Sequence, residues 1–342
     1  GAGMDGADRM AVNPGVGDLW IGNGYKRLMN GEDTIMWVNP NILVYTESAD
    51  IGFASGNDTL MASGGSGYMT EYSMKYSLAS YNGSIHGNVG GDLGVYGGAI
   101  QSATGDIELH IGEDLTLDVL EGSAIRTTGE VPLNAYYQFE YWNAANGGSI
   151  DLDVGGNVIT TYNSLNPNAW DNVYLDNGYR LWGANYTTSY QSGMKPTAGI
   201  AAMAGGDVTV SAGGDVQCQI GAFGPGDLIV LANGDMDGRF LIHGDEAVTD
   251  SALLRAAGNF GTLPKLDNQS IEMFYGNVDL QAQGNIQLGT VYNPTIARVG
   301  LNEIHLWNLT YDMASSVSLM TPNGDIKFAG VVSGMDPVSY TH

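Results

Sequence analysis

Apolar and polar residues alternate in a short phrase that returns along the chain. It reads GDIELHIGED at 105–114, GSIDLDVGGN at 148–157, GDVTVSAGGD at 206–215, GDLIVLANGD at 226–235 and GNVDLQAQGN at 276–285, with a looser copy, GSIHGNVGGD, at 83–92. In the copy at 105–114, Ile107, Leu109 and Ile111 occupy every second position, and Glu108 and His110 lie between them. A period of two residues predicts β-strands with one buried face and one face in water.

Each phrase begins and ends with a turn signal. Glycine tolerates positive φ, and Asp, Asn or Ser can hydrogen-bond the backbone locally. We therefore expect each copy to form two strands around a corner. The first polar residue of each copy should stack on that of the next copy as a structural ladder, formed by Ser84, Asp106, Ser149, Asp207, Asp227, Asn277 and Asp325.

The spacing of the copies selects among all-β architectures. Successive ladder residues are 22, 43, 58, 20, 50 and 48 positions apart, mostly near one or two multiples of the low twenties. Degenerate copies at 250–259 and 302–310 halve the gaps that follow Asp227 and Asn277. A unit of about 20–25 residues suits one three-strand coil of a parallel β-helix better than a propeller blade of roughly 40–45 residues. The sequence predicts an all-β solenoid with loop insertions.

The regularity of the pattern varies along the chain. We interpret 1–57 as atypical first coils or a cap, 58–330 as coils with an aromatic-rich insertion region at 120–204, and 331–342 as a terminal tail. Twelve of the 32 aromatic residues lie between Tyr136 and Tyr190. Insertions emerge on the side of a solenoid, and aromatic side chains there can stack on sugar rings or form a protein interface. Packing among the insertions themselves is the alternative. The candidate binding residues are Tyr136, Tyr137, Tyr141, Trp142, Trp170, Tyr174, Trp182 and Tyr186.

The composition narrows the choice of partners. The net charge is −25, with only 12 Lys and Arg residues, so a nucleic acid backbone would be repelled. No apolar run reaches the 18 residues of a membrane-spanning helix. Cys218, the single cysteine, occupies an inward position of VQCQI and is expected to be a buried small hydrophobe. A glycan, another surface protein or a second copy of the chain remain as partners.

Catalytic and metal-binding patterns are weak. Stacked carboxylates of Asp106, Asp207 and Asp227 could bind Ca²⁺, but the same position accepts Asn and Ser, which favours turn capping and no cofactor. The five His residues are scattered in the sequence, and no nucleophile triad, zinc spacing or phosphate loop is found. We predict that the chain is not an enzyme. A β-helical polysaccharide lyase or hydrolase with paired carboxylates near the insertions is the rival hypothesis.

The phrases GDVTVSAGGDVQC and GNVDLQAQGNIQL resemble the haemagglutinin-type repeats of filamentous-haemagglutinin-like bacterial exoproteins. The resemblance covers about half of the chain, mainly 83–119, 148–160, 205–235 and 276–290. It implies a right-handed parallel β-helix, secretion or display on the cell surface, and a role as an adhesin or stalk. The Asn-Pro-Asn motifs at 39–41 and 166–168 lack the glycine that often follows in the family's secretion domain, and we interpret them as turns.

The resemblance and the residues together predict a structural or adhesive segment of a secreted or cell-surface β-helix, which binds a glycan or neighbouring chains through side-surface loops. A self-polymerising extracellular filament subunit is a further alternative.

Overall fold

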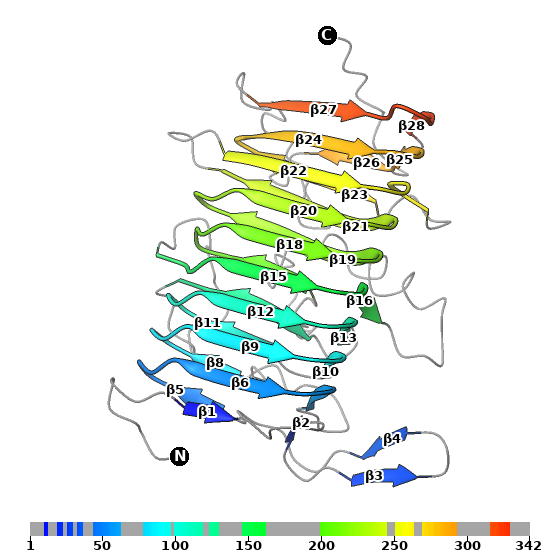
Figure 1. Ribbon diagram of the computed structural model, residues 1–342. Coiled ribbons are helices and arrows are strands. Elements are labelled where there is room, and N and C mark those ends of the chain that lie inside the picture. The colour runs from blue at the N-terminus through cyan, green and yellow to red at the C-terminus, as the bar shows by residue number, and fades with distance from the viewer. Residues whose placement is uncertain are drawn as a thin grey trace, which may run out of the picture.

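The computed structural model describes residues 10–12, 19–22, 26–29, 33–36, 44–62, 78–96, 99–118, 123–129, 146–161, 199–244, 250–262, 269–292 and 315–328. Every regular element in these ranges is a β-strand, and the strands stack as successive coils along one axis (Figure 1). The predicted all-β parallel solenoid is therefore confirmed. One coil carries a strand on each of three faces.

The first face is a ten-stranded sheet in which every strand is parallel to its neighbours. At about 4.8 Å between strands, this stack is on the order of 45 Å long. Its members in order are β1 (Met10–Val12), β6 (Ile51–Ser55), β9 (Ile85–Val89), β12 (Ile107–Ile111), β15 (Ile150–Val154), β18 (Val208–Ala212), β20 (Leu228–Ala232), β22 (Asp250–Ala256), β24 (Gly276–Ala282) and β27 (Ser316–Met320).

The second and third faces are also parallel and merge in the middle of the stack. The second face holds β2 (Leu19–Gly22), β7 (Thr59–Ala62), β10 (Leu93–Tyr96), β13 (Leu115–Asp118) and β16 (Val158–Thr161). It continues as the two-stranded sheet of β25 (Ile286–Leu288) and β28 (Ile326–Phe328), which isolated bridges of Phe260 to Met236 and to Ile286 connect to β21 (Met236–His243). The third face holds β5 (Val44–Thr46), β8 (Leu78–Ser80), β11 (Ala99–Ser102), β14 (Ala124–Thr127), β17 (Gly199–Ala202), β23 (Ser270–Phe274) and β26 (Thr290–Tyr292). Two long strands, β19 (Val216–Phe223) and β21 (Met236–His243), span both faces, because β19 pairs with β16 at its start and with β17 at its end.

An antiparallel hairpin interrupts the first coil. It consists of β3 (Lys26–Met29) and β4 (Asp33–Met36), which pair with each other between β2 and β5 in the chain. The strands β1, β2 and β5 occur in the segment 1–57 that we interpreted as atypical first coils or a cap, and the described coils end with β28 at Phe328.

Period-two alternation places the core as predicted. In β12, Ile107, Leu109 and Ile111 are buried, whereas Glu108 and His110 are exposed. The parallel register aligns inward residues of one strand with inward residues of the next. Leu109 is aligned with Leu152, and both belong to a column of buried apolar side chains on the first face. Burial of each such side chain contributes about 1.5–3 kcal/mol, and the core is continuous from coil to coil.

The coil lengths correct part of the predicted spacing. The shortest coil separates Asp207 from Asp227 by 20 residues, but neighbouring coils also separate Asp106 from Ser149 by 43 and Ser149 from Asp207 by 58. These long gaps each hold one coil with an insertion and not two coils, because β12 pairs directly with β15 and β15 with β18.

The two degenerate copies have different outcomes. The copy at 250–259 is a coil, with β22 at its start, as predicted. The prediction of a separate coil at 302–310 is wrong. β27 pairs directly with β24, so no coil lies between these two strands. Residues 302–310 themselves lie outside the described ranges.

Truncation of a core residue should cost far more than truncation of its outward neighbour. Leu152 is fully buried in β15, and Asp151 beside it is exposed. We expect Leu152→Ala to lower the free energy of unfolding by about 2–5 kcal/mol and Asp151→Ala to change it by less than about 0.5 kcal/mol. Urea titration followed by circular dichroism measures both. Equal effects of the two substitutions would contradict the assigned register.

Candidate functional site

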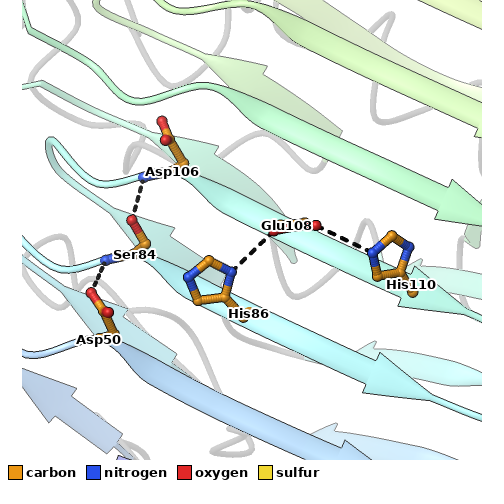
Figure 2. Close-up of polar contacts among 6 residues, drawn as sticks. All are labelled: Asp50, Ser84, His86, Asp106, Glu108 and His110. Carbon is orange, nitrogen blue, oxygen red and sulfur yellow. Dashed lines mark hydrogen bonds and ion pairs between the residues drawn. The ribbon is translucent and has the colours of Figure 1, made fainter. Parts of the chain in front are cut away.

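The turn that precedes each first-face strand, here called the first corner, is linked from coil to coil by side-chain hydrogen bonds. The backbone N–H of Ser84 donates to Oδ1 of Asp50 at 3.0 Å, and that of Asp106 donates to Oγ of Ser84 at 3.1 Å (Figure 2). The same bond recurs at Ser149, Asp207, Asp227 and Ser251, each donating to the corner residue of the coil before it.

The turn between the first-face and second-face strands, the second corner, carries an equivalent and longer ladder. Each backbone N–H donates to the side-chain oxygen of the preceding coil's corner residue over 2.6–2.9 Å. Its members are Asp58, Asp92, Asp114, Asn157, Asp215, Asp235, Asn259, Asn285 and Asp325. These residues belong to the turn signal that ends each phrase, which was not predicted to stack.

The predicted ladder is therefore divided between two corners. Ser84, Asp106, Ser149, Asp207 and Asp227 lie at the first corner, and Asn277 joins them there, with its Oδ1 accepting from the Ser316 hydroxyl at 2.7 Å. Asp325 lies instead at the second corner, where its N–H donates to Asn285. The assignment failed because a Gly-Asp pair occurs at both corners, for example Gly105-Asp106 and Gly234-Asp235.

Glycine at the first corner is required by the close approach of the coils. A Cβ at Gly105 would lie 2.2 Å from the carbonyl oxygen of Gly83, which no side chain tolerates. Gly206 has the same problem against Gly148 and also holds φ at +99°, a conformation that L residues rarely adopt. The Gly-Asp phrase thus combines two separate needs, space in the glycine and an acceptor in the residue after it.

The corner carboxylates act as hydrogen-bond acceptors for backbone groups. Asp106, Asp207 and Asp227, the weak candidates for Ca²⁺, each accept the N–H of the following coil through Oδ1. Ser149 accepts through its hydroxyl at an equivalent position, so the role needs no charge. Among the described residues, no group of three or more His, Cys, Asp or Glu side chains is arranged to hold a metal ion.

A charged cluster that the sequence analysis did not predict lies on the outer side of the first face. Nδ1 of His86 is 3.2 Å from Oε2 of Glu108, and Nε2 of His110 is 3.3 Å from Oε1 of the same carboxylate (Figure 2). His110 also approaches Asp153 of the next coil at 3.8 Å. The register of the copies at 83–92 and 105–114, which aligns His86 with Glu108, was the signal that could have revealed it.

The chemistry of this cluster is that of a surface ion-pair network. The side chains of His86, Glu108 and His110 are 42–48% exposed, so solvent screens their interactions. Such pairs contribute about 0–1 kcal/mol each and carry positive charge on the imidazoles only when these are protonated. The cluster links the strands of three neighbouring coils, β9, β12 and β15.

A second unpredicted feature is the fully buried carboxylate of Asp237 in β21. Its oxygens accept from the N–H and hydroxyl of Thr262, at 2.6 and 2.5 Å, and from Nε2 of Gln269 at 2.9 Å. Three donors satisfy a buried charge, which would otherwise be strongly unfavourable. Asp237 therefore fixes the chain after Phe260 to the long strand β21, and its oxygens are committed to that structural contact.

The eight aromatic candidates, from Tyr136 to Tyr186, lie outside the described residues. The strands around them are described. Residues 130–145 separate β14 from β15, and residues 162–198 separate β16 from β17. Residues 130–145 thus follow the third-face strand β14, and residues 162–198 precede the next third-face strand β17, so the two segments flank β15 and β16 in the chain.

Comparison of the chain with protein-family models, with curated proteins and with solved structures found no match. No helix within the described ranges is long and apolar enough to cross a membrane.

Substitutions of Asp215 at the second corner test whether the residue is needed as a hydrogen-bond acceptor or for its charge. Asp215 accepts the N–H of Asp235 at 2.8 Å, and Asn fills the equivalent position at Asn157 and Asn259. We expect Asp215→Asn to leave stability within about 0.5 kcal/mol of the wild type and Asp215→Ala to lower it by about 1 kcal/mol. Thermal melts with and without EDTA measure this. A large loss in Asp215→Asn together with an EDTA effect would indicate a cation site instead.

Cys218 should be unreactive in the folded protein. Its side chain is fully buried in β19, as predicted, and burial raises the pKa of the thiol, so the nucleophilic thiolate does not form. We expect negligible labelling by iodoacetamide at pH 8 in native buffer and complete labelling in guanidinium chloride, measured by intact-mass spectrometry. Rapid native labelling would show that the interior opens at this coil.

Proposed function

We propose that this chain is a structural segment of a secreted or surface-anchored bacterial protein, folded as a right-handed parallel β-helix, which presents side insertions to a glycan or a neighbouring chain. The observation that carries this proposal is the commitment of the repeated positions to coil stacking. Corner side chains accept backbone N–H groups, and inward side chains form the core. The repeated part of the sequence builds a stiff rod.

A rod of this kind separates support from recognition. Parallel hydrogen bonding along two large sheets restrains every coil against its neighbours, so insertions held by the rod keep fixed positions along its length. The segments 130–145 and 162–198 carry the aromatic candidates and flank β15 and β16 in the chain. Tyr and Trp provide large contact areas at low ordering cost, which suits weak, repeated binding to sugars or protein surfaces.

The location and biological class rest on the sequence pattern. The Gly-Asp phrases resemble haemagglutinin-type repeats of bacterial exoproteins, and the acidic surface, with a net charge of −25, suits a strand-rich rod that must stay soluble. Self-repulsion between such rods also opposes uncontrolled pairing at their sheet edges.

Removal of the aromatic candidates tests the recognition part of the proposal. We expect simultaneous Tyr141→Ala, Trp142→Ala, Trp170→Ala and Trp182→Ala substitutions to weaken binding to a glycan array or to immobilised chain at least tenfold, with an unchanged far-ultraviolet circular dichroism spectrum. Tyr81→Ala with Tyr96→Ala, which removes two half-buried aromatics from other coils, is the matched control.

We expect the quadruple variant to lose binding and the control variant to keep the binding of the wild type. The comparison therefore distinguishes recognition by the insertions from a general effect of removing aromatic residues. Wild-type binding by the quadruple variant would refute the role of the insertions, and turnover of a polysaccharide that is lost on a single carboxylate substitution would replace the structural function with an enzymatic one.

A further inference from the structure

The outer side of the third face is buried, unlike the outer side of the first face. On the first face, the outward residues of β12 and β15 are exposed. On the third face, both the inward and the outward residues of β11 and β14 are buried. Ala79, Ala99 and Ala124 form a small apolar cluster there, which is separate from the core of the solenoid. Side chains on this side are therefore withdrawn from water although they lie outside the core.

A guanidinium group lies in this buried layer. Arg126 of β14 is aligned with Gln101 of β11, and the two residues are only 8% and 1% exposed. Nε of Arg126 donates to Oε1 of Gln101 at 2.6 Å. Arginine has five N–H donors in a planar fork, so the two terminal nitrogens remain for other partners, and no carboxylate of the described residues pairs with them. Because a buried charge without a partner is strongly unfavourable, this position is suited to an anion.

A buried hydroxyl group follows two residues later. Thr128 comes directly after β14, and its backbone N–H donates to the carbonyl of Ser102 in continuation of the pairing between β14 and β11. By the alternation of the strand, Thr128 lies on the same side as Arg126. Thr128 is 7% exposed, and its Oγ1 has no hydrogen-bond partner among the described residues. Buried polar atoms are nearly always hydrogen-bonded, so this hydroxyl is a second group that a ligand can satisfy.

We propose that Arg126, Gln101 and Thr128 form a binding site for a carboxylate group on the outer side of the third face. The terminal nitrogens of a guanidinium match the two oxygens of a carboxylate in a bidentate pair. Gln101 fixes the plane of the guanidinium, and the hydroxyl of Thr128 supplies a further donor on the same side. The site offers one positive charge in a chain of net charge −25, which favours a singly charged carboxylate over a phosphate dianion.

The carboxylate has two sources that the same chemistry would accept. One is an acidic sugar of a glycan, and this source rests on the proposed function and names its ligand class. The other is a side chain of the insertions that flank β15 and β16, and it holds whatever those insertions bind. The acidic residues of the two insertions are Glu130, Glu140, Asp171 and Asp176.

Calorimetric titration with galacturonate, with its neutral counterpart galactose and with inorganic phosphate tests the first source. We expect wild-type chain to bind galacturonate, to bind phosphate more weakly and not to bind galactose. Arg126→Gln should weaken galacturonate binding at least tenfold, and the nearly isosteric Thr128→Val about threefold. Arg255→Gln makes the same change at an exposed arginine on the outer side of β22 and should leave binding unchanged. Circular dichroism of every variant verifies folding.

Thermal melts test the second source. If an insertion supplies the carboxylate, one of Glu130→Gln, Glu140→Gln, Asp171→Asn and Asp176→Asn should lower the melting temperature as much as Arg126→Gln does. Combining that substitution with Arg126→Gln should then cause no further decrease, because both remove the same ion pair. Asp153→Asn, at an exposed carboxylate of the first face, is the control and should add to Arg126→Gln independently.

The outcomes separate this site from the aromatic candidates. Galacturonate binding that requires Arg126 and persists in the quadruple aromatic variant would support the site while refuting the role of the aromatic residues. The proposal is overturned if Arg126→Gln binds galacturonate like the wild type, or if phosphate binds more tightly than galacturonate. Absence of galacturonate binding together with additive effects of all four insertion substitutions would also overturn it, because no carboxylate would then occupy the site.

Discussion

The hydrogen bond from a backbone N–H to the corner side chain of the preceding coil is the interaction on which the stack depends. At each turn the chain leaves one sheet and enters another, so sheet pairing alone cannot satisfy every backbone group there. A short Asp, Asn or Ser side chain reaches the N–H of the next coil and restores the missing acceptor. Because the bond connects equivalent residues, it also fixes the register of one coil on the next.

Much of this could be predicted from the sequence because strand alternation and corner chemistry are local. The alternation of Ile107, Leu109 and Ile111 predicts the inward face of a strand, and the pair Gly105-Asp106 predicts a turn. The number of coils could not be predicted in this way, because it depends on which distant strands pair. The gap of 43 residues has the length of two coils and the gap of 58 exceeds it, and only the pairing of β12, β15 and β18 shows that each contains one coil and an insertion. The assignment of Asp325 failed for a related reason, since both corners use the same residue types.

Contacts between side chains that are distant in the sequence also could not be predicted from it. The cluster of His86, Glu108 and His110 depends on the exact register between two copies, and Asp237 depends on donors that lie 25 and 32 residues later. The contact between His86 and Glu108 can be read only by aligning the two copies, and the donors to Asp237 have no signal of their own in the sequence. Their arrangement follows from the fold, which must be known before the side chains can be placed together.

The insertions are not distributed evenly around the stack. From Asp50 to Asn277, the residue at the second corner follows the one at the first corner by eight positions in every coil. The long segments 63–77 and 162–198, in contrast, each lie in the chain between a second-face strand and the third-face strand that follows it. The coil from Asp207 to Asp227 has only 20 residues and begins and ends with the same Gly-Asp pair. Duplication or deletion of such a gene segment would keep the corner hydrogen bonds and the inward alternation between neighbouring coils, so the length of the stack can change without a new kind of core.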